Sequence, residues 1–182
     1  MLRVKTYVPL VAILSLLLSG TVMAGPSDGE AVARQGVVRC GGNHFLRLSG
    51  TEAHTTFYVL RNYNSTRSIT IDRMLAFEAD GSVLFDSDVS GLPATTNDIL
   101  GPADNLLQPN QTAQFDSGNI VPSFLAQTDR PIQLEIQWSA TGKVLILDVS
   151  LVRLGRQRDP ATGSIGVERS RFLRECTSIS LR

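Results

Sequence analysis

The chain has 182 residues, of which 17 are basic and 17 acidic, and 42% are hydrophobic. This length allows a single domain with a substantial core. The balanced charge excludes a global field that would steer the chain onto nucleic acid or an anionic membrane, so we expect no nucleic-acid partner.

The first 24 residues predict an export signal. Arg3 and Lys5 precede an apolar stretch at residues 10–18, and small residues of the A-x-A type end at Ala24, as in a cleaved signal peptide. The alternative is a retained anchor, but a spanning helix needs about 20 apolar residues. We predict cleavage after Ala24, a periplasmic or secreted location and no later membrane segment. Since two basic residues and no acidic residue leave with the signal, the mature net charge is −2.

The mature chain divides into a short polar start and one β domain. Residues 25–35 are small and polar, with early Gly and Pro, which indicates a flexible N-terminus. Residues 36–182 consist of short apolar segments separated by turn residues at intervals of about ten, a pattern typical of an all-β sandwich or barrel. We predict a single all-β sandwich of about seven to nine mostly antiparallel strands.

The first clear strands lie in the middle of the chain. Residues 55–62 are rich in β-branched and aromatic types, and residues 68–78 largely alternate. The alternation would place Ile69, Ile71, Leu75 and Phe77 on one face. Asp80-Gly81 predicts a hairpin with a type I′ turn, and residues 83–85 would form the partner strand.

Residues 86–110 interrupt the β pattern with Gly, Pro, Asp and Asn. A loop of this length is unusual in a compact domain, so we expect either a surface excursion or a functional loop, stiffened by its prolines. A further strand is predicted at residues 111–115.

The cleanest alternation covers residues 131–138 and places Trp138 on the apolar face. Residues 140–143 predict a turn, and residues 144–152 suit a central strand buried on both faces. A second loop is expected at residues 157–166.

Residues 167–182 would form one last strand, with a short helix at residues 167–175 as the alternative, since that piece lacks Gly and Pro.

Two cysteines in an exported chain allow one intramolecular bridge, between Cys40 and Cys176. An oxidising compartment favours that bridge. It would require the first and last strands to be neighbours. On the chain-entropy model, closing so long a loop gives at most about 5 kcal/mol of stability.

The two histidines define an alternative function. His44 and His54 form, with Cys40, the only cluster of soft metal ligands, and Met74 is the available thioether in the mature chain. These residues predict, as the alternative, a copper- or zinc-binding periplasmic protein that uses His44 and His54. A disulfide at Cys40 would remove its sulfur from such a site, and the leading interpretation has no cofactor.

No catalytic motif is found. The sequence lacks a G-x-S-x-G nucleophile turn, a P-loop and a G-x-G-x-x-G motif. The aspartates of residues 86–110 lack the D-x-D-x-D-G spacing of a calcium loop. We therefore predict that the protein is not an enzyme.

Several structural motifs follow one another along the chain. They are an Arg-Asn strand end at residues 57–62, an Ile-x-Ile strand at 68–71, an Asp-Gly hairpin at 77–81, a Leu-x-Pro strand entry at 107–109 and a later strand at 136–138. This series resembles small bacterial exported immunoglobulin-like domains of uncharacterised function. The resemblance covers about half of the mature chain and implies an immunoglobulin-like sandwich. It implies no catalytic or binding residue.

These observations predict a non-enzymatic exported β-sandwich with a partner-binding or structural role. The partner would be another exported or envelope protein. The candidate binding surfaces are residues 86–110 and the arginines Arg153, Arg156 and Arg158. On this interpretation, deletion of residues 90–108 should spare folding and abolish capture of the partner.

Overall fold

The computed structural model describes residues 32–121, 123–125 and 132–181. The predicted signal peptide and its cleavage site after Ala24 lie outside these residues. Within them, no helix is long and apolar enough to span a membrane.

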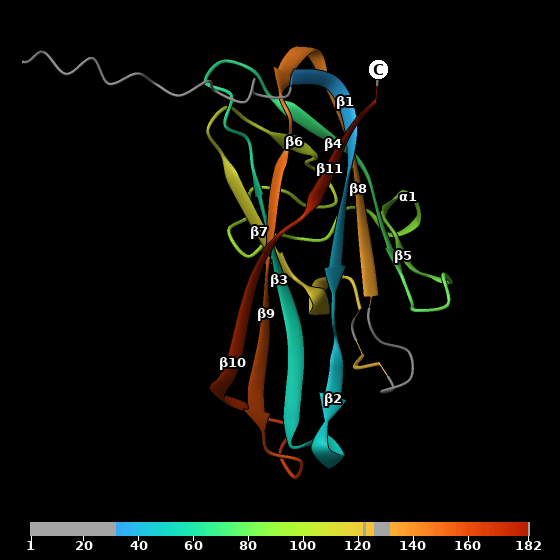
Figure 1. Cartoon of the computed structure of the whole chain (residues 1–182), viewed down its shortest axis with the longest axis vertical. Coiled ribbons are helices and arrows are strands. Elements are labelled where there is room, and N and C mark those ends of the chain that lie inside the picture. The colour runs from blue at the N-terminus through green and yellow to red at the C-terminus, as the bar shows by residue number, and fades with distance from the viewer. Residues whose placement is uncertain (1–31, 122, 126–131, 182) are drawn as a thin grey trace, which may run out of the picture.

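The described chain forms two antiparallel sheets packed face to face, so the prediction of an all-β sandwich is confirmed (Figure 1). Sheet A has the order β11 (Thr177–Leu181), β1 (Val32–Gly42), β8 (Ile132–Leu145), β4 (Ile69–Phe77) and β5 (Val83–Asp86), and β6 (Leu106–Leu107) also pairs with β4. Sheet B has the order β10 (Ile165–Glu175), β9 (Asp148–Arg158), β3 (Glu52–Arg61) and β2 (Phe45–Arg47), and β7 (Thr112–Asp116) also pairs with β3. Three short helical turns complete the described elements: η1 (Leu48–Gly50), α1 (Ser87–Ser90) and η2 (Ser117–Asn119).

Eleven strands are present instead of the seven to nine expected. Two of the additional strands, β2 and β6, have only three and two residues, which is too short for a recognisable alternation. The first strand also begins earlier than expected. Because β1 starts at Val32, the last four residues of the predicted flexible segment belong to sheet A.

The core lies between the sheets and is built from alternate residues of their central strands. In β8, the side chains of alternate residues are each at most 2% exposed, as the alternation predicts: Ile132, Leu134, Ile136 and Trp138. Together with Tyr58 of β3, these side chains are among the largest fully buried ones of the domain.

A bulge shifts side chains of β4 away from their predicted faces. In β4 the pairing with β8 slips between Ile71 and Arg73, and an extra residue in a strand reverses the alternation that follows it. Met74 and Ala76 are therefore buried in place of the predicted Leu75 and Phe77.

The predicted turn at residues 140–143 is wrong, because β8 continues through it to Leu145. Opposite these residues, the pairing with β1 jumps from Ser139 to Val144, so they form a wide bulge in place of a chain reversal. The reversal lies at residues 146–147, and β9 then forms a central strand of sheet B, as predicted.

The Asp80-Gly81 hairpin joins β4 to β5 as predicted, but the turn is not type I′. Only Gly81 has a positive φ, 89°, whereas type I′ requires two such residues. Hydrogen bonds link Glu78 N to Ser82 O (2.9 Å) and Gly81 N to Glu78 O (3.1 Å), which closes a three-residue loop. The Asp80 carboxylate accepts hydrogen bonds from the Ser82 amide and hydroxyl, at 2.9 and 2.7 Å.

Residues 86–110 lie against the core and close one side of the sandwich. Leu92, Leu100 and Leu107 are 7%, 3% and 0% exposed. The segment is bonded to sheet A through Ile71 N and Asn105 O (2.8 Å), and to β7 of sheet B through Thr96 N and Gln114 O (2.6 Å). This burial argues against the expectation that deletion of residues 90–108 would spare folding, since the deletion would remove three buried leucines.

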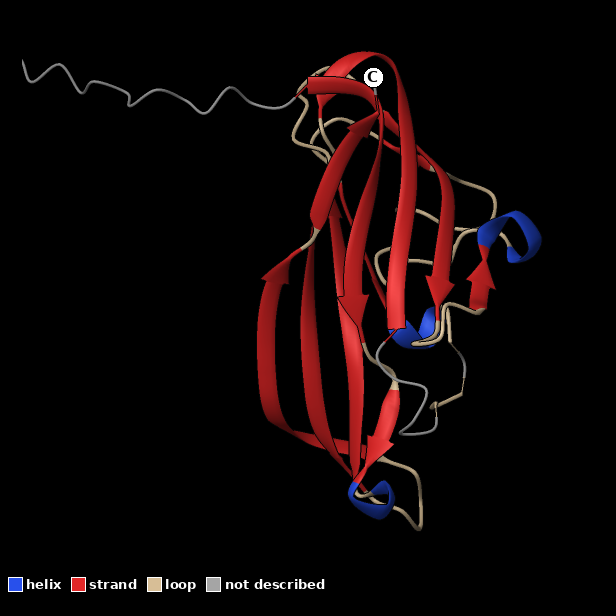
Figure 2. Cartoon of the chain, turned by 45° about the vertical axis from the view of Figure 1, so that its right-hand side comes forward, coloured by secondary structure: helices blue, strands red, loops and turns tan. Residues whose placement is uncertain are grey.

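The chain crosses between the two sheets at two further places. The chain passes from β1 in sheet A to β2 in sheet B, and from β10 in sheet B to β11 in sheet A. Figures 1 and 2 show that the sheets are offset along the long axis, so β10, β9, β3 and β2 extend beyond the ends of β1 and β8. One end of the inner face of sheet B is thus left without a facing sheet.

Candidate functional site

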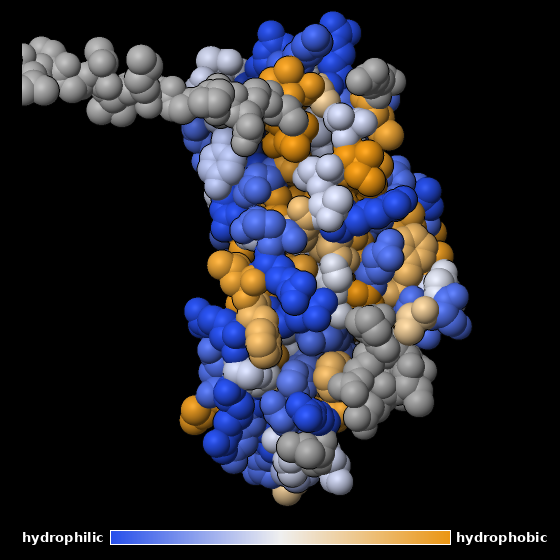
Figure 3. All heavy atoms as spheres, viewed as in Figure 1, coloured by the Kyte–Doolittle hydropathy of each residue, from blue (hydrophilic) through white to orange (hydrophobic). Residues whose placement is uncertain are grey.

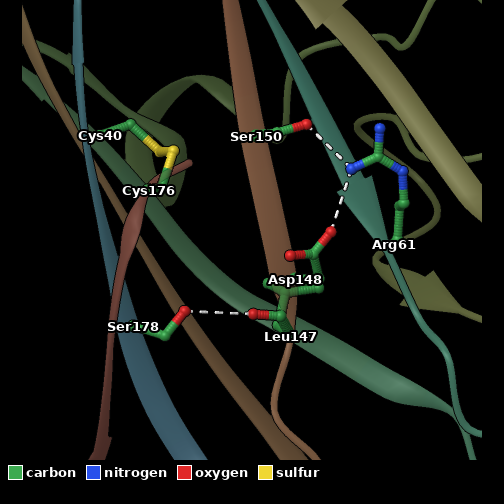
Figure 4. Close-up of a disulfide and its surroundings, with 7 residues drawn as sticks. All are labelled: Cys40, Arg61, Leu147, Asp148, Ser150, Cys176 and Ser178. Carbon is green, nitrogen blue, oxygen red and sulfur yellow. Dashed lines mark hydrogen bonds and ion pairs between the residues drawn. A yellow bond between two sulfur atoms is a disulfide. The ribbon is translucent and has the colours of Figure 1, made fainter. Parts of the chain in front are cut away.

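The disulfide lies where the chain crosses between the sheets. Cys40 of β1 and Cys176, the residue between β10 and β11, are joined as predicted. The Cys176 amide donates to Val149 O in sheet B (2.9 Å), and the Ser178 hydroxyl donates to Leu147 O (3.3 Å). The bridge therefore attaches the joint of the last two strands to both sheets (Figure 4). The first and last strands are neighbours, as the bridge requires.

A buried polar network lies at the other crossing, between β1 and β2. The Asn43 amide donates to the Thr56 hydroxyl (2.9 Å), and the Thr56 amide donates to the Ser117 hydroxyl (3.0 Å). Ser117 also shares a hydrogen bond with Nδ1 of His44 (2.9 Å). Burial lowers the pKa of His44, against the opposing effect of the Asp116 charge. This imidazole is therefore part of a structural network.

The two histidines have different partners. His44 stacks on Phe124, with ring centroids 4.5 Å apart, whereas His54 stacks on Phe45 at 4.6 Å. Nε2 of His54 also lies 3.1 Å from a carboxylate oxygen of Glu52. Among the described residues, no group of three or more His, Cys, Asp or Glu side chains is placed to hold a metal ion. Met74 is fully buried in the core, and Cys40 is in the disulfide.

The three predicted binding arginines do not form one surface. Arg153 is paired with Thr56, whereas the Arg156 guanidinium lies 5.4 Å from the ring centroid of the adjacent Phe57. Successive residues of a strand point to opposite faces, so Arg153 and Arg156 lie on opposite faces of sheet B. Arg158 donates to Gly50 O at the tip of the sheet (3.2 Å).

The structure reveals an exposed strand edge that the sequence did not single out, the outer side of β10 and β11. We call residues 165–181 the bare edge, because no strand within the described part of the chain pairs with that side. Its exposed apolar side chains are Ile165, Val167, Phe172, Leu173, Ile179 and Leu181. On the face seen in Figure 3, apolar spheres lie among hydrophilic ones along the flank where β10 runs.

The opposite side of the sandwich, which we call the covered edge, consists of β2, β5, β6 and β7 with residues 86–110 packed along it. Its strands have two to five residues each. Leu125 forms a bridge with Phe45 of β2, and Asn97 donates to Thr112 O of β7 (2.7 Å). Natural sheets commonly shorten or cover their edges in this way, and the bare edge is the exception.

The signal for the bare edge is present in the sequence but is weak. Phe172 and Leu173 are adjacent, so in a strand one lies on each face, and charged residues surround them. The helix alternative for residues 167–175 is wrong, since β10 covers all of them. A strand that is exposed on both faces lacks the period-2 pattern that a half-buried strand shows.

No protein-family model matches the chain, and neither a curated protein nor a solved structure matches it. The resemblance to exported immunoglobulin-like domains therefore stays a prediction.

Proposed function

We propose that the protein is an exported binding protein that takes up an extended segment of another exported or envelope protein as an additional strand on β10. The observation that carries this proposal is the bare edge. Val167, Phe172 and Leu173 are 70%, 63% and 66% exposed. Strand addition uses backbone hydrogen bonds for affinity and alternate side chains for specificity.

The backbone of β10 supports this mode of binding. The Cys176 amide donates inward, to Val149 on the β9 side. In an antiparallel ladder the direction alternates along the strand, so the amides of Arg171 and Leu173 point outward. An incoming strand would meet these free donors, with Leu173 on one face of the sheet and Phe172 on the other.

The charges on β10 favour a specific partner over self-aggregation. Arg169, Arg171 and Arg174 interrupt the apolar residues, and charged side chains on an edge discourage unspecific pairing. Glu168 forms an ion pair with Arg171 (3.0 Å), which lowers the pKa of the Glu168 carboxyl. The remaining positive charge favours an acidic segment as the added strand.

The predicted export of the chain and its disulfide both support this proposal. A bridge between Cys40 and Cys176 is stable in an oxidising compartment, which is where the predicted signal would deliver the chain. The proposal assigns binding, with no catalytic step.

Site-specific crosslinking tests the proposal. A photo-reactive side chain is placed at Val167 on the bare edge or, as a control, at Val83 on the covered edge, which is 57% exposed. The mature protein is then irradiated in envelope extracts of its source organism. We expect a discrete heterologous product from position 167 and none from position 83.

A proline variant tests whether the product depends on strand addition. Leu173→Pro removes an outward amide and leaves the ladder with β9, because proline is tolerated on the solvent side of an edge strand. Leu173→Thr is the matched control, since it removes the same side chain and keeps the amide. Loss of the product in Leu173→Pro alone supports the proposal. An unchanged product in that variant, or crosslinking only to a second copy of the chain, would contradict it.

A further inference from the structure

Beside β10, on the inner face of sheet B, the cation Arg153 has no counter-ion among the residues that the structure describes. Its Nε is shielded from solvent and has no hydrogen-bond acceptor, and among the described residues it forms no ion pair. Four other arginines of the described chain, Arg39, Arg61, Arg73 and Arg171, do have carboxylate partners. An unpaired charge is least stable where it is partly buried, so Arg153 is the cation that most needs an anion.

Two glycines keep space open around this guanidinium. A Cβ atom on Gly41 would lie 2.7 Å from Nη2 of Arg153. A Cβ atom on Gly155 would lie 2.5 Å from the Ser170 hydroxyl and 3.0 Å from Cε1 of His54. Either substitution would therefore fill space that the present residues leave vacant.

The space is a cavity of about 260 Å³. It lies at the end of sheet B that extends beyond sheet A, and it is lined by Asn43, His54, Arg153, Ser170, Phe172 and Arg174, with Leu154 and Gly155 at its floor. Two guanidinium groups give it positive charge. The Glu52 carboxylate, which lies 2.8 Å from the position of a Cβ atom on Gly155, is 3.1 Å from Nε2 of His54. Its volume is just below the usual range for ligand pockets, about 300–1,000 Å³.

We propose that this cavity is a binding site for a small carboxylate with a short carbon chain. The guanidinium plane matches the two oxygens of a carboxylate, and the side-chain amide of Asn43 and the Ser170 hydroxyl add uncharged donors. The Phe172 ring supplies an apolar wall for the carbon chain. The size of the cavity favours a small anion over a nucleotide.

The site shares Phe172 with the strand-addition surface but does not use the outer backbone edge of β10. A strand added to β10 would lie along its outer edge, whereas the cavity opens on the inner face between β9, β10 and Asn43. Each proposal can therefore fail without the other.

Succinate is a suitable probe, with inorganic phosphate and chloride compared at equal ionic strength. Binding to the mature, disulfide-bonded protein is followed by two-dimensional nitrogen–proton NMR, which also records the Arg Nε–H groups. We expect saturable succinate-dependent shifts at the backbone amides of Asn43 and Ser170 and at the Nε–H of Arg153. Chloride should leave these signals unmoved.

Arg153→Met is the decisive variant, and Arg156→Met, on the opposite face of the same strand, is its matched control. Charge-assisted hydrogen bonds contribute enough free energy that succinate affinity should fall roughly tenfold to a hundredfold in Arg153→Met. The succinate affinity of Arg156→Met should lie within about twofold of that of the parent, since this variant leaves the charged groups of the cavity unchanged. Gly41→Ala should also weaken binding by displacing the guanidinium. The NMR spectra verify that each variant is folded.

Several results would overturn the proposal. These are equal succinate affinity in Arg153→Met and Arg156→Met, the absence of saturable shifts, or saturation by phosphate alone.

Discussion

The two long edges of this sandwich differ, because one is covered by other segments of the chain and the other is exposed. Along the covered edge, residues 86–110 connect sheet A to sheet B and bury three leucines. Along the bare edge, the outer sides of β10 and β11 have no partner strand within the described part of the chain. The comparison shows that polar composition is a poor guide to exposure, since the segment rich in Gly, Pro and Asp buries side chains in the core. The last apolar segment of the chain is the one that remains accessible.

Removal of the disulfide should produce the largest effect, and it tests what holds the bare edge in place. In Cys40→Ala/Cys176→Ala, the free energy of unfolding should fall by about 3–5 kcal/mol, because the bridge closes a loop over a sequence separation of 136 residues. Urea denaturation measures this change. Hydrogen exchange should show β10 and β11 losing protection before β7 and residues 95–100.

Equal loss of protection over the bare and covered edges would mean that both depend equally on the bridge. That result would contradict the expected difference between the two edges. The parent protein at the same pH, with its bridge intact, is the control.

Leu107→Ala is expected to have the next largest effect, a loss of about 2–5 kcal/mol, since it leaves a cavity beneath the covered edge. Leu107 is fully buried, whereas Leu173 on the bare edge is 66% exposed. Leu173→Ala should therefore change the free energy of unfolding by no more than about 0.5 kcal/mol. Both values come from urea denaturation. Similar losses in the two variants would mean that the two edges are equally structural.

Acidification should lower the free energy of unfolding by a smaller amount, through His44, the residue before β2. Burial lowers the pKa of His44 below its ordinary value of 6.5, so the unfolded chain takes up a proton first as the pH falls. The free energy of unfolding should then decrease from about pH 6.5 downward, until the pH is below the pKa of the folded protein. His44→Gln should remove this slope, as measured by urea denaturation between pH 8 and pH 5.

The carboxyl groups titrate in a separate, lower range. Hydrogen bonds lower the pKa of Asp86, chiefly through Arg73, and that of Asp159, chiefly through the Ala161 amide. Their contribution is complete above the unfolded pKa of 3.8 and is lost only as the pH falls through the folded values. A parent-like slope in His44→Gln at pH 5–6.5 would assign the effect to another group.

Features that depend on neighbouring residues could be predicted from the sequence alone. The alternation that buries Trp138 follows from the two-residue period of a strand, and the Asp80-Gly81 hairpin follows from the freedom of glycine at positive φ. The bridge between Cys40 and Cys176 could also be predicted, because two cysteines allow only one pairing. These features establish the all-β class.

Features that depend on distant segments were decided by the tertiary structure. The bulge beside Ile71 arises from pairing with β8, more than 60 residues away, and reverses which side chains are buried. Residues 86–110 are structural because β4 and β7 offer them hydrogen-bond partners. Within the described residues Arg153 has no counter-ion, because β1, β9 and β10 meet around it without contributing an ion-paired carboxylate. Local patterns carry no information about such long-range contacts, and both the bare edge and the arginine cavity consist of them.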